Sequence, residues 1–260
     1  MRRPGRGLLG TLLSAGSAAL AWEAFARSGL FAPALTPSVL LVTAAVARMV
    51  ADGTLFGHML YTFARIGAGM ALAAAVGIPV GVWMGRQPRV ERFVLPLVSV
   101  LSPIPSLAWV PLFIMWLGLG NAAAVALVTY AATFPLVLNT WTGVRTVNPL
   151  WIRAAEAMGA DSRRLFRRVV LPAALPAVVS GLRQAFARSW IAVVGGEMIA
   201  ATSWGLGWVI FDSKEFLNTD VMLGTLVVIG LVGLAVERWG FQVLEARTVG
   251  RWGMLRAAGS

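Results

Sequence analysis

Two short helices joined by a glycine are predicted in the segment from Val147 to Pro172, VNPLWIRAAEAMGADSRRLFRRVVLP. Asn148 can cap the first helix, because its side-chain oxygen can accept a backbone N–H, and Pro149 suits the first helical position. Gly159 can end that helix in the left-handed conformation. The order of cap, helix, glycine, cap and helix therefore predicts a helix–turn–helix.

The second helix of this segment is predicted to be two-faced. It starts at a cap on Asp161 or Ser162, and Pro172 is expected to start the next helix. At about 100° per residue, one half of the helix is basic and the other apolar. The basic half holds Arg163, Arg164, Arg167 and Arg168, and the apolar half holds Leu165, Phe166, Val169 and Val170. Such a helix lies along a membrane surface, although a basic loop that only sets orientation is the simpler alternative.

Long apolar runs on both sides of this segment predict an integral membrane protein. Of the 260 residues, 58% are hydrophobic and 13% are charged, whereas soluble domains average about 45–50% and about 25%. A helical span needs about 20 residues, and a shorter run at Ser38–Val50 is expected to be interfacial. The predicted fold is an all-α bundle of six spans. These are Leu8–Ala26, Leu60–Met84, Val94–Leu117, Ala122–Trp141, Ala173–Ala201 and Val221–Val236.

The chain is expected to divide into three parts. Residues 1–57 hold the first span, a periplasmic connection and the interfacial helix. Residues 58–245 form the main transmembrane unit with a cytoplasmic loop at 143–171, and residues 246–260 form a cytoplasmic tail. The first run resembles a secretory signal, but five further runs favour an uncleaved span.

Basic residues predict the orientation of the bundle. Sixteen arginines fall between spans on the side of the amino terminus, against two arginines and one lysine on the other side. Cytoplasmic loops of membrane proteins carry an excess of Lys and Arg, so both termini are expected in the cytoplasm. The net charge of +11 is thus attributed to orientation and to contact with lipids, and no nucleic-acid partner is expected.

Several catalytic and nucleotide-binding motifs are missing. The sequence has no cysteine, no G-x-x-x-x-G-K-[ST] loop and no H-E-x-x-H. Its only histidine, His58, is expected to be a surface or interfacial residue and not a metal ligand. We therefore expect neither an enzyme nor a metal site, and any ATP used must bind another chain.

Charged residues within the apolar runs are candidates for function. A charge at the bilayer centre costs about 2.5–3.5 kcal/mol on insertion scales, so these residues should face the interior, a cavity or each other. Arg65 or Arg188 is hypothesised to attract an anionic cargo, and Glu197 is the candidate ion-coupling carboxylate of an alternative mechanism. Arg183 lies near the cytoplasmic end, where it can extend to the interface.

Small residues and prolines shape two of the predicted spans. Gly69, Ala73, Gly77, Gly81 and Gly85 recur every four residues, which favours close packing inside the subunit, with a homodimer seam as the alternative. Prolines, with the neighbouring Ser102, interrupt the third span and predict either a kinked helix that lines a pathway or a static kink. These prolines are Pro103, Pro105 and Pro111.

The spacing Ala154-Ala155-x3-Gly159-x9-Val169-x-Leu171-Pro172 resembles the EAA loop of ABC importer permeases. Four other stretches resemble the nitrate/sulfonate/taurine branch of that family, and the resemblance extends over roughly residues 33–243. One position departs from the motif, because Arg153 stands where the family usually has Glu. The stretches are Leu101–Ser106, Phe134–Thr140, Gly143–Pro149 and Gly205–Trp208.

The resemblance implies a membrane-spanning permease of the type I class that is driven by separate ATPases. It implies two ATPase subunits that bind ATP and Mg²⁺, a second permease copy, and a periplasmic or lipid-anchored binding protein. The solute is expected to be small and anionic, and the location to be the bacterial inner membrane. The ATPase-coupling residues would be Arg153, Ala154, Ala155, Glu156, Gly159, Ala160, Arg163, Val169, Leu171 and Pro172. The candidate pathway residues are Arg65, Ser102, Pro103, Pro105, Arg188 and Glu197.

Two other functions are compatible with a six-span bundle. An ion-coupled secondary transporter would use Glu197 and a proton or sodium gradient, although the chain lacks the internal repeat common in such proteins. A membrane scaffold would show no solute-dependent activity. Copurification of an ATPase and a binding protein would distinguish the ATP-driven permease from both.

Overall fold

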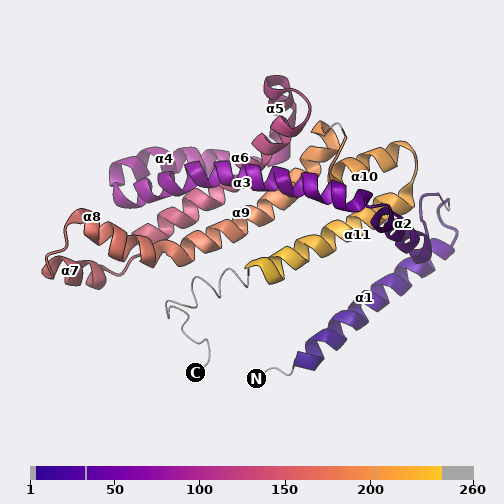
Figure 1. Cartoon of the computed structure of the whole chain (residues 1–260), viewed down its shortest axis with the longest axis horizontal. Coiled ribbons are helices and arrows are strands. Elements are labelled where there is room, and N and C mark those ends of the chain that lie inside the picture. Colours follow the sequence, from indigo (N-terminus) through magenta and orange to yellow (C-terminus); the bar gives the residue numbers. More distant parts are fainter. Residues whose placement is uncertain (1–3, 33, 202, 242–260) are drawn as a thin grey trace.

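The computed structural model describes residues 4–32, 34–201 and 203–241, and all regular elements in these ranges are helical. The long helices run roughly along one axis of the molecule (Figure 1). In chain order the helical elements begin with α1 Pro4–Arg27, α2 Val39–Ala51, α3 Thr54–Arg86, α4 Pro88–Leu101, the short 3₁₀-helix η1 Ser106–Trp109 and α5 Val110–Leu117. There follow α6 Asn121–Arg145, α7 Pro149–Ala157, α8 Ser162–Leu165, the π-helical turn η2 Phe166–Val170, α9 Leu171–Ala200, α10 Leu206–Glu215, α11 Thr219–Ala235 and the π-helical turn η3 Val236–Gly240.

The predicted membrane character is confirmed by the length and composition of these helices. Four of them are long and apolar enough to cross a bilayer, and the bent α4–η1–α5 unit makes a fifth if counted as one span. The predicted first span, Leu8–Ala26, lies within α1, a helix of 24 residues that is not among the four or five helices long and apolar enough to cross, so the sixth predicted span stays a prediction. The predicted interfacial run is α2, a separate helix of 13 residues. The predicted tail at 246–260 lies outside the described residues.

The centre of the bundle is built on α6, which packs along α3 on one side and along α9 on the other. Glycines allow both contacts to be close. A Cβ at Gly77 would lie 3.0 Å from the Cβ of Leu136, and one at Gly143 would lie 2.6 Å from the Cβ of Ala177. The glycine repeat on α3 thus faces α6 of the same chain, which confirms packing inside the subunit as the favoured interpretation.

Gly81→Ala is expected to lower stability. The added methyl would lie 2.7 Å from the Cβ of Thr140 and 2.7 Å from the carbonyl oxygen of Val137 on α6, and overpacking of this kind costs about 1–3 kcal/mol. Gly67→Ala is the matched control on the same helix, because nothing lies within 4 Å of a Cβ there. Thermal unfolding in detergent would measure both variants. Equal midpoints would contradict the packing argument.

The third predicted span was expected to be kinked, but the structure breaks it. α4 ends at Leu101, and the helix that resumes at Ser106 is bent by 88° from it. Pro103 and Pro105 offer no backbone N–H to a continuing helix. The Tyr130 hydroxyl of α6 donates to the Leu101 carbonyl at 2.7 Å. This bond gives a hydrogen-bond partner to a carbonyl that the break leaves outside the regular helix pattern.

The second helix of the 147–172 segment was expected to lie along the membrane surface, with a new helix starting at Pro172. That expectation was wrong, because α8, η2 and α9 form one continuous helix of 39 residues, Ser162–Ala200. In η2 the Leu171 N–H donates to the Phe166 carbonyl, which is the wider π pattern. Pro172 follows that turn, where its missing N–H interrupts the hydrogen bonding without ending the helix.

Candidate coupling segment and membrane cavity

The coupling segment, residues 147–172, has the predicted caps. The Asn148 side chain accepts from the Leu150 N–H at 2.9 Å, and the Asp161 side chain accepts from the Arg164 N–H at 2.7 Å. Gly159 has a φ of +78°. Two hydrogen bonds close the end of α7, from the Ala160 N–H to the Ala155 carbonyl at 3.0 Å and from the Gly159 N–H to the Glu156 carbonyl at 2.9 Å. This is the Schellman arrangement that an αL glycine permits.

The outer face of α7 combines apolar and charged side chains. Leu150, Trp151 and Met158 are 68%, 49% and 81% exposed, and exposed apolar side chains in a cluster mark interaction surfaces. Arg153 and Glu156 of α7 are exposed as well. Of the other predicted coupling residues, Ala155 is buried, Ala160, Val169 and Pro172 are half-buried, and Ala154, Gly159, Arg163 and Leu171 are exposed.

A cation–π contact from α3 reaches the coupling segment, and an ion pair between α6 and α4 lies at the same end of the bundle. The Arg86 guanidinium at the end of α3 lies 4.6 Å from the centre of the Phe166 ring, a favourable cation–π distance. Arg145, at the end of α6, pairs with Glu91 of α4. Figure 1 shows α7, α8 and the amino-terminal end of α4 at the same end of the bundle. Arginines predicted to be cytoplasmic thus gather at one end, as the predicted orientation requires.

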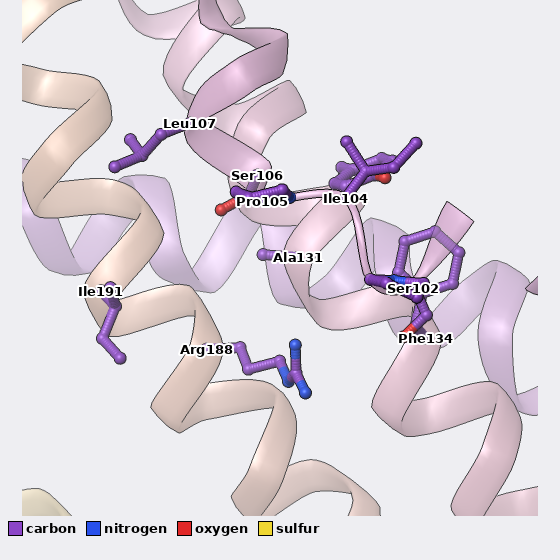
Figure 2. A pocket seen from close by; sticks show the side chains of 11 residues that line it. Ser102, Ile104, Pro105, Ser106, Leu107, Ala131, Phe134, Arg188 and Ile191 are labelled. Carbon is purple, nitrogen blue, oxygen red and sulfur yellow. The ribbon is translucent and has the colours of Figure 1, made fainter. Parts of the chain in front are cut away.

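A cavity lies where the third span breaks (Figure 2). Its volume is about 260 Å³, and it is bounded by the Ser102–Leu107 break, by α6 and by α9. The structure brings four of the predicted pathway residues together here: Ser102, Pro103, Pro105 and Arg188. Tyr130 and Phe134 of α6 also line the cavity. These two aromatic residues were not among the predicted pathway residues, although Phe134 begins one of the stretches that resemble the permease family.

Arg188 supplies the charge of this cavity. Figure 2 shows its side chain extending from α9 toward Ser102 and Phe134. It lies 17 residues after Leu171 and 12 before Ala200, about 26 Å and 18 Å at 1.5 Å per residue, which is near the middle of the span. Among the described residues, the Arg188 guanidinium has neither a hydrogen bond nor an ion pair. A charge at this depth is tolerated when it faces a water-filled cavity.

Arg65 and Glu197 lie elsewhere, in a buried pair. Arg65 Nη1 is 2.7 Å from Glu197 Oε1, and the two side chains are 5% and 0% exposed. Thr62 Oγ1 donates to the same carboxylate at 2.9 Å, and the Gly207 N–H donates to it at 2.9 Å. Arg65 also donates to the Trp204 carbonyl at 2.6 Å. Every charge in the network therefore has a partner inside the protein, and the network joins α3, α9 and the start of α10.

His58 extends this network toward the loop before α10. It was predicted to be a surface or interfacial residue, but its exposed fraction is 8%. Its Nδ1 accepts from the Gly205 N–H at 3.2 Å, and its ring lies 4.7 Å from that of Trp204 and 5.8 Å from that of Trp208. The two tryptophans cover it, which sequence spacing did not reveal. No group of three or more His, Cys, Asp or Glu residues suited to a metal ion occurs within residues 4–32, 34–201 and 203–241.

A membrane-crossing bundle with a helix–turn–helix at one end and a charged cavity inside has the organisation of a solute-transport subunit. The family model for the binding-protein-dependent transport system inner membrane component matches residues 77–247. The taurine transport system permease protein TauC of Escherichia coli is 35% identical over 231 residues, which cover 87% of this chain and 83% of TauC. The bicarbonate transport system permease protein CmpB of Synechococcus elongatus is 29% identical over 245 residues, 91% of this chain and 85% of CmpB.

A solved structure of the MetNI methionine ABC transporter, in an inward-facing conformation, contains a chain with the same fold. The TM-score is 0.66 at 22% identity, covering 75% of this chain and 97% of that one. The present chain belongs to the family of binding-protein-dependent transport system inner membrane components. It is a multi-pass inner-membrane permease of an ABC importer, and ATP hydrolysis belongs to a separate subunit. The family supports the ATP-driven mechanism and gives no support to the ion-coupled alternative.

Proposed function

We propose that this permease works as a homodimer on two ATPase subunits and imports a small anion delivered by a periplasmic or lipid-anchored binding protein. ATP and Mg²⁺ bind the ATPases. The coupling segment docks on an ATPase through the outer face of α7, and both chain termini lie in the cytoplasm. Nucleotide-driven movement at α7 switches the bundle between inward-facing and outward-facing states.

One observation carries this proposal: the helix that follows α7 runs without a break from the coupling segment to the cavity. Ser162 begins it at the end where α7 lies, and Arg188 projects from it into the cavity. A displacement of α7 therefore reaches the cavity through a single element of secondary structure. The anionic nature of the cargo is supported by the unpaired cation and by relatives named for taurine and bicarbonate transport.

Arg153, which departs from the EAA motif, gives the proposed docking surface a positive charge. Arg153 and Glu156 are both exposed on α7, so the surface presents a cation at the position where the EAA motif that this segment resembles has Glu. An acidic groove on the partner ATPase would complement it, because opposite charges across an interface favour the correct partner.

Purification of the tagged chain from mild detergent tests the proposal. We expect an ATPase chain and a binding protein to copurify, and reconstituted liposomes to accumulate solute only with ATP. Liposomes that receive a non-hydrolysable ATP analogue are the control and should show no accumulation. Uptake driven by a proton or sodium gradient, without any ATPase chain, would contradict the proposal and favour the ion-coupled alternative.

A further inference from the structure

The long helix Ser162–Ala200 has a weak place between the coupling segment and the cavity. In η2 the Leu171 N–H donates to the Phe166 carbonyl in the wider π pattern, and Pro172 has no N–H to donate. Helices kink at π turns and at prolines. Since η2 packs against α7, a force applied at α7 acts directly on this place. A bend there would reduce the movement that reaches Arg188.

One contact from α3 braces this weak place. The Arg86 guanidinium lies 4.6 Å from the centre of the Phe166 ring, and Phe166 is the first residue of η2. Among the described residues, the Arg86 guanidinium has neither a hydrogen bond nor an ion pair, so the ring is its partner there. Arginine suits this contact, because its planar group stacks on an aromatic face, whereas the ammonium group of lysine is a compact point charge.

The helix that carries Arg86 is itself firmly held. Arg86 is the last residue of α3, and the neighbouring Gly85 packs closely on α6, where a Cβ would lie 2.6 Å from the Cβ of Val144. Toward its other end α3 bonds to the long helix through the pair of Arg65 and Glu197. Arg65 and Arg86 are 21 residues apart, about 32 Å at 1.5 Å per residue. The long helix is therefore joined to α3 at two widely separated places.

Resting on the proposed docking of α7 on an ATPase, we propose that Arg86 is a positioning residue for ATP-driven transport. By holding Phe166 against the end of α3, it keeps the long helix from bending at η2, so that a displacement of α7 moves α3, α6 and α9 together. Without this contact the ATPases still bind and hydrolyse ATP, but part of each displacement is lost as a bend before it reaches the cavity.

The absence of native cysteine makes a test possible that does not depend on the identity of the cargo. Ser102→Cys places the only thiol of the chain in the cavity wall. In the full chain reconstituted with its ATPase, the rate at which sulfonatoethyl methanethiosulfonate modifies this thiol is measured with and without ATP, and the label is counted on the permease chain by mass spectrometry. The ratio of the two rates reports how far the ATPase moves the cavity.

Arg86→Gln should bring this ratio about two- to fivefold closer to one, while ATPase binding and the rate of hydrolysis stay unchanged. That factor corresponds to the free energy of an exposed cation–π contact, about 0.5–1 kcal/mol, and a contact cannot shift a conformational equilibrium by more than its own free energy. Phe166→Leu should have the same effect, and the double variant should be no worse than either single variant, because all three lose one contact.

Matched variants separate the contact from charge and from folding. Phe166→Tyr keeps an aromatic ring and should keep the ratio. Arg89→Gln removes the same charge from the same end of the bundle, where the structure shows no ring contact for Arg89 among the described residues, and should leave the ratio unchanged. Ser106→Cys, also in the cavity wall, repeats the measurement if Ser102→Cys does not fold.

Two results overturn the proposal alone: a ratio that Arg86→Gln leaves unchanged, or effects of Arg86→Gln and Phe166→Leu that add in the double variant. A loss of ATPase binding in Arg86→Gln would also overturn it, since Arg86 would then act in docking. If ATP does not change the modification rate even with Arg86 in place, the proposed function fails and this proposal fails with it. The two failures are therefore distinguishable.

Discussion

Glu197→Ala is expected to prevent most of the protein from reaching a stable folded state. The substitution leaves the Arg65 guanidinium, whose side chain is 5% exposed, without its carboxylate. It also removes the acceptor for Thr62 and for the Gly207 N–H. Breaking a buried pair by removing one partner costs about 3–5 kcal/mol. The yield of monodisperse protein and the midpoint of thermal unfolding in detergent would measure this loss.

Two comparisons separate a buried unpaired charge from a general loss of a carboxylate. The double variant Arg65→Met/Glu197→Leu removes both charges and should recover much of the lost stability, since buried pairs are often replaceable by apolar residues. Glu215→Ala is the matched control. It breaks the exposed pair with Lys214 at 3.3 Å, whose side chains are 54% and 65% exposed, and surface pairs contribute little. Equal losses in Glu197→Ala and in the double variant would contradict this account.

Deleting Arg153–Gly159 is expected to reduce ATP-driven uptake to the level of liposomes without ATP, while the chain still inserts into the membrane. The deletion removes most of α7 and the left-handed turn at Gly159, but no residue of the α3, α6 and α9 packing. ATPase binding, solute uptake and membrane insertion should be measured on the same preparations. Normal coupling of hydrolysis to uptake in the deletion variant would refute the assignment of the coupling segment.

A milder variant distinguishes loss of docking from loss of folding. Trp151→Ala trims the exposed apolar face of α7 without altering its caps, and we expect weaker ATPase binding with unchanged thermal stability. Phe216→Ala is the control, because Phe216 is an exposed aromatic residue next to α10, at the opposite end of the bundle (Figure 1). Equal loss of ATPase binding in both variants would show that α7 has no special part in docking.

Features that depend on local chemistry were predictable from sequence. The caps at Asn148 and Asp161 and the turn at Gly159 follow from side chains that bond to backbone a few residues away. The glycine spacing on α3 likewise predicts one close-packed face. Four of the predicted pathway residues line one cavity, and they could be named in advance because a proline-rich interruption and a mid-span arginine are visible in the sequence itself.

Features that depend on tertiary packing were not predictable. Three prolines indicate a bend in the third span, but they do not reveal an 88° break or that the Tyr130 hydroxyl of α6 bonds to the backbone there. The pairing of Arg65 with Glu197 joins residues 132 positions apart, so only a folded bundle reveals that these two charges meet each other. Pro172 does not start a new helix as predicted, because it follows the π turn η2 inside one continuous helix.

The uninterrupted Ser162–Ala200 helix also relates a movement at its α7 end to a movement at the cavity. Glu197 bonds the carboxyl-terminal end of this helix to α3 and α10, so the helix can pivot about that end. Arg188 stands nine residues from it and Ser162 thirty-five, or about 14 Å and about 53 Å at 1.5 Å per residue. A displacement applied beside α7 would move the Arg188 guanidinium by roughly a quarter as much, so the cavity would change shape by less than the coupling segment moves.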